Sequence, residues 1–137
     1  MPSGSCFCGS VRYSYINEPL SKCLCHCYDC RKIGGSTYSV NLIIPDSAFT
    51  LLTHSTLKSV SKLADSGKKV EQYFCGNCGT TLYSLCVGMP GVHIIKAGTL
   101  DDINGLDDAK PVTELFVSHR VCWVPAIPDS KQAVAMQ

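Results

Sequence analysis

The sequence lacks an excess of charge of either sign. Its 137 residues include 12 Lys and Arg against 11 Asp and Glu, which leaves a net charge of +1 when the histidines are neutral. A protein that binds nucleic acid or an anionic membrane surface through its charge needs a basic face or a basic cluster. We therefore expect no nucleic-acid partner and no membrane partner.

Long hydrophobic runs are also missing. A membrane-spanning helix needs roughly 18 or more apolar residues in succession, and no run in this chain approaches that length. Residues 1–6 carry neither the charged stretch nor the apolar stretch of a secretory signal, so we expect no such signal. Without one, the ten cysteines indicate metal thiolates rather than a secreted disulfide scaffold, and we expect a reducing, cytoplasmic compartment.

Familiar catalytic patterns are absent as well. No Ser/His/Asp grouping, phosphate-binding loop or paired-carboxylate motif stands out in the sequence. What the chain contains instead is a series of short β-type runs separated by turn residues, at 10–15, 38–44, 49–52, 57–63, 70–74, 81–85, 92–96 and 112–117. This pattern predicts one mainly β domain over residues 1–125, followed by a loose C-terminal tail over residues 126–137.

The most informative segment is residues 23–30, which holds four cysteines in eight positions. Cys25, Cys27 and Cys30 form a C-x-C-x-x-C motif, and clustered thiolates select zinc or iron–sulfur over hard cations. Three protein ligands with an open fourth position are typical of a catalytic zinc. Cys23 could add a fourth sulfur and close the site, which would then be structural.

Two further half-sites lie far apart in the sequence, at Cys6-x-Cys8 and Cys75-x-x-Cys78. Together they would supply the four sulfurs of a structural zinc and join the N-terminus to the middle of the chain. Spacing alone does not show which half-sites meet. The alternative is that one of these pairs joins two cysteines of the central segment.

Taken together, these motifs resemble the glutathione-dependent formaldehyde-activating family, the S-(hydroxymethyl)glutathione synthase-like domains. The matching segments follow the family's order and are residues 4–13, 25–36, 73–80, 97–102 and 121–123. The resemblance implies a β-tent fold of short antiparallel strands around zinc–cysteine knuckles, with two zinc ions per chain. The implied ligands are Cys6, Cys8, Cys75 and Cys78 for the structural zinc, and Cys25, Cys27 and Cys30 for the catalytic-type zinc.

A zinc ion held by three thiolates carries a net charge of −1 and is a weak Lewis acid, so a fourth thiolate suits it better than an activated water. A thiolate held in this way is a nucleophile, and it could add to the carbon of an aldehyde. The reverse reaction cleaves a carbon–sulfur bond. We therefore expect a zinc-dependent carbon–sulfur lyase that handles a thiol adduct of an aldehyde or another small molecule, with glutathione as the possible co-substrate.

Residues beside the central motif could assist this reaction. His26, between two ligands, could carry a proton, and Ser36, just after Gly34-Gly35, could donate a hydrogen bond into the site. Arg31 and Lys32 could hold a substrate carboxylate.

Two other functions fit the same sequence. One is an enzyme of this scaffold that acts on a glutathione-independent metabolic intermediate by elimination, addition or isomerisation. The other is a non-catalytic zinc module that binds a protein partner, which a centre closed by Cys23 would favour.

Overall fold

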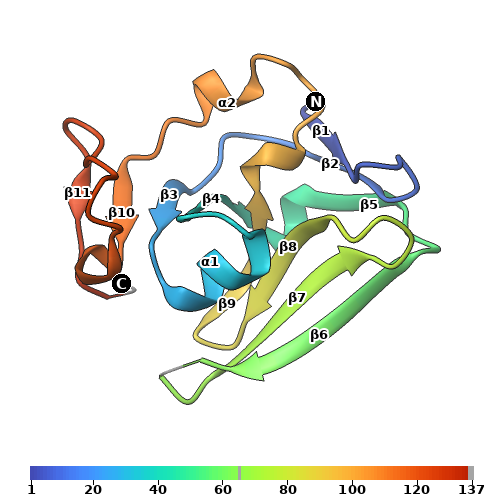
Figure 1. Ribbon diagram of the computed structural model, residues 1–137. Coiled ribbons are helices and arrows are strands. Elements are labelled where there is room, and N and C mark those ends of the chain that lie inside the picture. Colours follow the sequence, from blue (N-terminus) through green and yellow to red (C-terminus); the bar gives the residue numbers. More distant parts are fainter. Residues whose placement is uncertain (65, 136–137) are drawn as a thin grey trace.

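β-Strands dominate the computed structural model, which describes residues 1–64 and 66–135 (Figure 1). The described strands form a three-stranded sheet in the order β1-β2-β5 and an eight-stranded sheet in the order β11-β10-β3-β4-β9-β8-β7-β6. Most neighbours are antiparallel, whereas β10 runs parallel to both β3 and β11. The predicted mainly β fold of short antiparallel strands around cysteine knuckles is confirmed.

The eleven described strands are short. They are β1 (Ser3–Ser5), β2 (Arg12–Tyr15), β3 (Ser21–Cys25), β4 (Ser39–Pro45), β5 (Phe49–Thr53), β6 (Leu57–Leu63), β7 (Lys69–Cys75), β8 (Thr81–Cys86), β9 (Met89–Lys96), β10 (Thr113–Leu115) and β11 (Lys131–Gln132). The helical elements are α1 (Tyr28–Gly34), α2 (Gly105–Asp108) and the 3-10 turns η1 (Asp46–Ala48), η2 (Ala97–Thr99) and η3 (Val117–His119). Hydrophobic alternation found most of the strands, including both ends of β6, but missed β1, β3 and β11.

Helix α1 was also missed, and its packing explains why. The helix buries none of its residues, so it carries no apolar stripe for a periodicity search to find. Hydrogen bonds at its two ends stabilise it instead. The Cys27 Sγ accepts the backbone N–H of Cys30 at 3.2 Å, and Gly35 ends the helix in the left-handed region at φ 63°.

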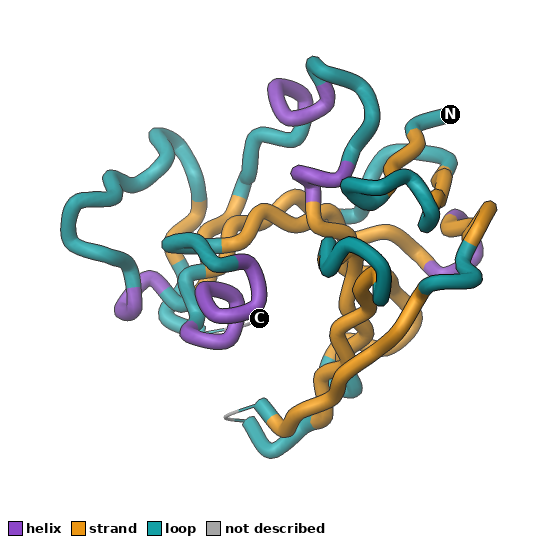
Figure 2. The backbone as a smooth tube through the Cα atoms, turned by 45° about the vertical axis from the view of Figure 1, so that its right-hand side comes forward, coloured by secondary structure: helices purple, strands orange, loops and turns teal. Residues whose placement is uncertain are grey.

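Strand β4 divides the buried side chains into two clusters. Leu42 and Ile44 point into the larger cluster, and Ile43 points to the opposite face, because successive side chains of a strand alternate. The larger cluster also contains Val11, Tyr13, Leu82 and Ile95. The smaller cluster contains Cys23, Cys25, Ile43, Leu115 and Ala133, with Cys27 and Cys30 packed against it. Figure 2 shows that the long sheet is strongly bent.

The segment for which a loose tail was expected makes ordered contacts in its described part, residues 126–135. Strand β11 lies there and pairs with β10, and Ala133 is buried in the smaller cluster. Residues 136 and 137 of the expected tail lie outside the described part of the chain. Among the helices that the structure describes, none has the length and hydropathy needed to span a membrane.

Candidate metal centres

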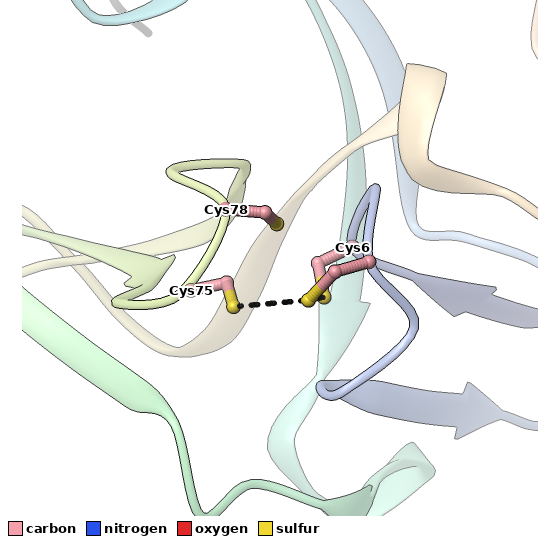
Figure 3. Close-up of side chains that lie close together, drawn as sticks. Cys6, Cys75 and Cys78 are labelled. Carbon is pink, nitrogen blue, oxygen red and sulfur yellow. Dashed lines mark hydrogen bonds between the residues drawn. The ribbon is translucent and has the colours of Figure 1, made fainter.

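The first group of sulfurs joins the two distant half-sites. Cys6, Cys8, Cys75 and Cys78 each place a sulfur within 4.8 Å of the others, and Figure 3 shows three of these residues converging from two segments. The Cys6 and Cys8 sulfurs are 3.6 Å apart, and those of Cys8 and Cys75 are 3.8 Å apart. Sulfurs bound tetrahedrally to zinc at ~2.3 Å would be about 3.8 Å from one another, so this group fits a closed four-thiolate zinc.

Hydroxyl groups favour the thiolate form at the rim of this first centre. A hydrogen bond with the Ser10 hydroxyl, 3.2 Å away, lowers the pKa of Cys8 to about 7. The Thr80 hydroxyl, 3.3 Å from its sulfur, is the main cause that lowers the pKa of Cys78 to about 5. The same Thr80 hydroxyl accepts the backbone N–H of Phe7 at 3.0 Å, which also ties the two half-sites together. Since thiolates are the metal-binding form, both contacts prepare the group for a cation.

The second group consists of Cys25, Cys27 and Cys30, whose sulfurs also lie within 4.8 Å of one another. Cys25 ends strand β3, Cys27 caps helix α1, and Cys30 lies in its first turn. The backbone N–H of Cys30 therefore donates to one sulfur of the group, as expected where a helix begins next to a thiolate. The donor set fits a zinc ion with three protein ligands.

Cys23 is not a member of the second group among the described residues. Burial raises the pKa of Cys23 to about 11. The described group therefore has three sulfurs, and the open fourth position stays a prediction.

A row of polar side chains crosses the sheet beside this centre, and sequence reasoning missed it. Ser39 pairs with Cys25 across the strands, and Asn41 lies between Cys23 on one side and Lys96 on the other. The Lys96 ammonium donates to the Asn41 carbonyl at 3.0 Å, and the Asn41 amide donates to the Ser39 hydroxyl at 2.9 Å. The available signal was two polar residues, Ser39 and Asn41, inside the β-type run at 38–44.

This polar row favours negative charge on Cys30, one member of the second group, whereas hydrogen bonds from Cys27 and Cys30 raise the pKa of Cys25. Hydrogen bonds from Cys25 and Cys27 lower the pKa of Cys30 to about 2, and the Lys96 charge and the Ser39 hydroxyl act in the same direction. The Lys96 ammonium therefore offsets part of the charge on Cys30 when that thiol ionises.

A pocket opens along helix α1, which also carries Cys27 and Cys30. It has a volume of about 380 Å³ and is lined by Tyr28, Arg31, Lys32 and Ser36. The Arg31 guanidinium lies 5.5 Å from the centre of the Tyr28 ring. The His119 ring stacks on the same Tyr28 ring, with 4.2 Å between the ring centres. Two cations beside an aromatic ring suit an anionic ligand such as a carboxylate. The structure thus brings Ser36 and both predicted cations to one pocket.

His26 lies elsewhere. Its imidazole is fully buried, and its Nε2 lies 2.7 Å from a carboxylate oxygen of Glu114. The proton-carrying role of His26 stays a prediction, as does the hydrogen-bonding role of Ser36. Glu114 was not identified from the sequence, where the only signal was an acidic residue inside the run at 112–117.

We expect Lys96→Met to weaken zinc binding at the second centre about tenfold, the equivalent of ~1.4 kcal/mol for a lost charge interaction. Competition with a chromophoric chelator would measure the zinc affinity. The phase of zinc release that Cys27→Ser loses belongs to the second centre. Lys96→Arg should restore affinity, and Lys69→Met, at an exposed position of β7, is the matched control. Unchanged release from Lys96→Met would contradict the electrostatic role of Lys96.

Comparisons with known proteins agree with this geometry. The family profile described as glutathione-dependent formaldehyde-activating enzyme matches residues 1–119. An uncharacterized lyase of Schizosaccharomyces pombe is 35% identical over 109 residues, which cover 75% of this chain and 71% of that protein. A protein of Emericella nidulans, provisionally named as a glutathione-dependent formaldehyde-activating enzyme, is 31% identical over 88 residues, 60% of this chain and 42% of its own length.

A solved structure supports the fold independently. The crystal structure of a Rhodobacter sphaeroides protein superposes with a TM-score of 0.61 at 19% identity, covering 77% of this chain and 93% of that one. At this identity the likeness concerns the fold alone. Because the family profile matches residues 1–119, the chain belongs to the glutathione-dependent formaldehyde-activating family.

Proposed function

We propose that this protein is a zinc-dependent carbon–sulfur lyase that handles a glutathione-type thiol adduct of an aldehyde. The observation that carries the proposal is the second sulfur group, which has three members among the described cysteines and shares helix α1 with a cationic pocket. When bound there, zinc would hold an incoming thiol as its thiolate near neutral pH. The lyase name of the yeast relative supports the reaction class.

The pocket residues supply the means to bind and orient such a thiol. Glutathione carries carboxylates, and an arginine binds a carboxylate through paired hydrogen bonds of fixed geometry. Contact with the Tyr28 ring restrains the Arg31 side chain, and the stacked His119 ring restrains Tyr28 in turn. Lys32 adds a second positive charge to the same wall.

In the proposed reaction the thiol sulfur forms a bond to the aldehyde carbon while the carbonyl π bond breaks. The thiol loses a proton and the carbonyl oxygen gains one, so the adduct contains every atom of the two reactants. The reverse reaction cleaves the carbon–sulfur bond and returns the thiol and the aldehyde. Ser36 lines the pocket, and we propose that its hydroxyl donates a hydrogen bond to the developing oxyanion.

The first sulfur group has a different part in this proposal. Four sulfurs leave no open position, so we assign Cys6, Cys8, Cys75 and Cys78 to a structural zinc, which makes two zinc ions per chain. Thiolate ligands and free cysteines need a reducing environment, and a cytoplasmic location belongs to the same proposal.

Substitution of one ligand in each group should separate the two roles. We expect Cys27→Ser to lower the zinc content by about one ion per chain and to abolish activity while the protein stays folded. Cys78→Ser should also lose about one zinc, but with a large loss of stability, because binding energy at a structural zinc is folding energy. Elemental analysis and thermal unfolding measure both effects. If Cys27→Ser unfolds as Cys78→Ser does, the second group is structural.

A direct assay would follow formation of the formaldehyde–glutathione adduct by exchange NMR, with the zinc-loaded full chain against the spontaneous rate. We expect acceleration by the protein, and Arg31→Gln should raise KM for glutathione about tenfold because it loses a charge-assisted hydrogen bond. Arg12→Gln, at an exposed position of β2, is the matched control and should behave as the parent protein.

Three outcomes of this assay would redirect the proposal. Acceleration that Arg31→Gln leaves unchanged would place the glutathione carboxylates elsewhere. No acceleration by a protein that holds two zincs with an open position would favour another small-molecule substrate. No acceleration together with an all-sulfur second centre would favour a zinc module that binds a protein partner.

A further inference from the structure

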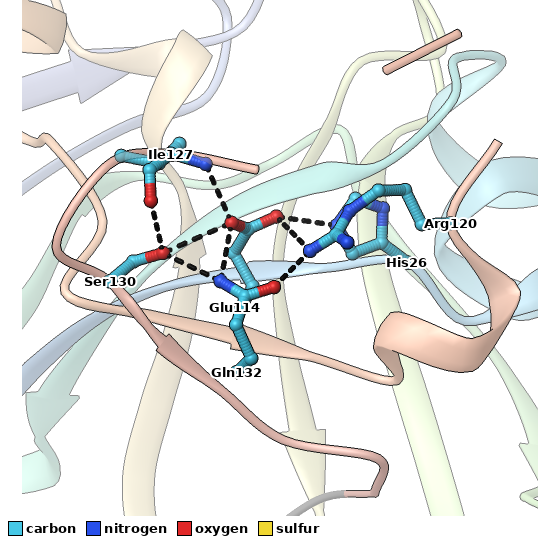
Figure 4. A network of polar contacts seen from close by, with 6 residues as sticks. All are labelled: His26, Glu114, Arg120, Ile127, Ser130 and Gln132. Atoms are coloured by element: carbon cyan, nitrogen blue, oxygen red, sulfur yellow. Dashed lines mark hydrogen bonds and ion pairs between the residues drawn. The ribbon is translucent and has the colours of Figure 1, made fainter. Parts of the chain in front are cut away.

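Glu114 on strand β10 is a carboxylate enclosed on all sides. The residue has 0% of its surface exposed, and its side chain lies at the centre of a polar network (Figure 4). Five donors surround it: His26 Nε2 at 2.7 Å and Arg120 Nη2 at 3.2 Å on Oε1, and Ile127 N at 2.8 Å, Ser130 Oγ at 3.0 Å and Gln132 Nε2 at 2.8 Å on Oε2.

Burial alone would raise the pKa of Glu114, but the hydrogen bonds outweigh it. Donors from Gln132, His26, Ile127 and Arg120 lower the pKa of Glu114 to about 2. The side chain is therefore an anion at neutral pH. A buried anion is tolerated only while its acceptor positions are filled, because removing its partners leaves an uncompensated charge that costs several kcal/mol.

One side of this network connects to the second sulfur group through the backbone of His26. His26 stands between Cys25 and Cys27, and its backbone N–H donates to the carbonyl of Leu115 at 3.0 Å. Leu115 in turn pairs with Cys25 in the parallel β3–β10 register. Strand β10 therefore holds the backbone around these ligands through Leu115, and it holds the His26 side chain through Glu114.

The other side of the network faces the C-terminal segment. The three donors to Oε2 all come from residues 127–132, and the Ala133 backbone N–H donates to the Glu114 carbonyl at 2.9 Å. Strand β11 has two residues and cannot hold this segment in place by pairing alone. The segment also lies beyond residues 1–119, where the family match ends.

We propose that Glu114 and residues 127–133 form a clamp, here named the Glu114 clamp, that fixes the Cys25–Cys27 backbone through His26. Glu114 is then a positioning residue for the second centre, and the C-terminal segment is a working part of that centre. The predicted effect of the clamp on metal affinity rests on the proposed function, because it requires zinc at Cys25, Cys27 and Cys30. The predicted effect of the clamp on the backbone of residues 23–30 does not depend on zinc.

The test compares Glu114→Gln with the parent in the full chain. The glutamine side chain has the shape of the glutamate side chain, but an NH₂ group replaces one acceptor oxygen. Because donors surround both oxygens of Glu114, this NH₂ group faces other donors in either orientation of the amide. We expect zinc release from the second centre, followed with a chromophoric chelator, to become about ten- to a hundredfold faster, the usual cost of removing a residue that orients ligands. Release from the first centre should not change.

A second measurement does not need the metal. Hydrogen exchange followed by mass spectrometry should show faster exchange in residues 23–30 of Glu114→Gln than in the parent. Glu71→Gln is the matched control, because Glu71 accepts a hydrogen bond from the Tyr73 hydroxyl on β7, remote from the clamp. It should leave both readouts unchanged.

The outcomes separate the clamp from the proposed function. A folded Glu114→Gln protein with unchanged zinc release and unchanged exchange at 23–30 overturns the clamp. If the parent holds only one zinc, the proposed function fails and the exchange readout alone decides on the clamp. If Glu114→Gln does not fold, Ser130→Ala removes one Oε2 donor and should speed both processes to a smaller extent. Ser61→Ala, at an exposed position of β6, is its control, and equal behaviour of the two serine variants also overturns the clamp.

Discussion

Convergence of sulfurs from distant segments is the constraint on which the rest of this structure depends. The strands are short, and the core is divided between the two faces of β4. The first sulfur group joins residues 6–8 to residues 75–78, so a cation held there closes a loop of about half the chain. Loop closure of this length is costly in entropy, and binding of a metal ion offsets that cost. In this account the first centre holds β1 and β2, which belong to the three-stranded sheet, to the segment that follows β7 of the long sheet.

The two centres share thiolate ligands and differ in what surrounds them. Hydroxyl groups of Ser10 and Thr80 contact the first group at the surface of the protein. The second group packs against a buried cluster; the Lys96 charge acts on Cys30, and His26, between two members of the group, contacts Glu114. In a closed centre four protein ligands fix the metal. In an open centre the protein must hold three sulfurs in place while a fourth ligand binds and dissociates. The surrounding charges and hydrogen bonds serve the second requirement.

Much of this structure could be predicted from the sequence because its strongest signals are local. Cysteine spacing predicted the half-sites, the family resemblance implied how they combine, and β-type runs between turn residues predicted β4 and β6 to β8 closely. Helix α1 was missed because capping by Cys27 and Gly35, rather than an apolar face, stabilises it. Lys96 and Glu114 were missed for another reason. Their importance comes from strand register, which brings them beside cysteines 66 or more positions away, and a single sequence carries no record of that register.

The central claim is that the second centre keeps an open position for a thiol. X-ray absorption at the zinc edge, on protein purified without chelators, tests it most directly. With one four-sulfur and one three-sulfur centre, the account predicts an average of about 3.5 sulfurs per zinc, rising to about 4 when glutathione is added. An average of about 4 before addition, with no change afterwards, would mean that both centres are closed, and it would contradict the account.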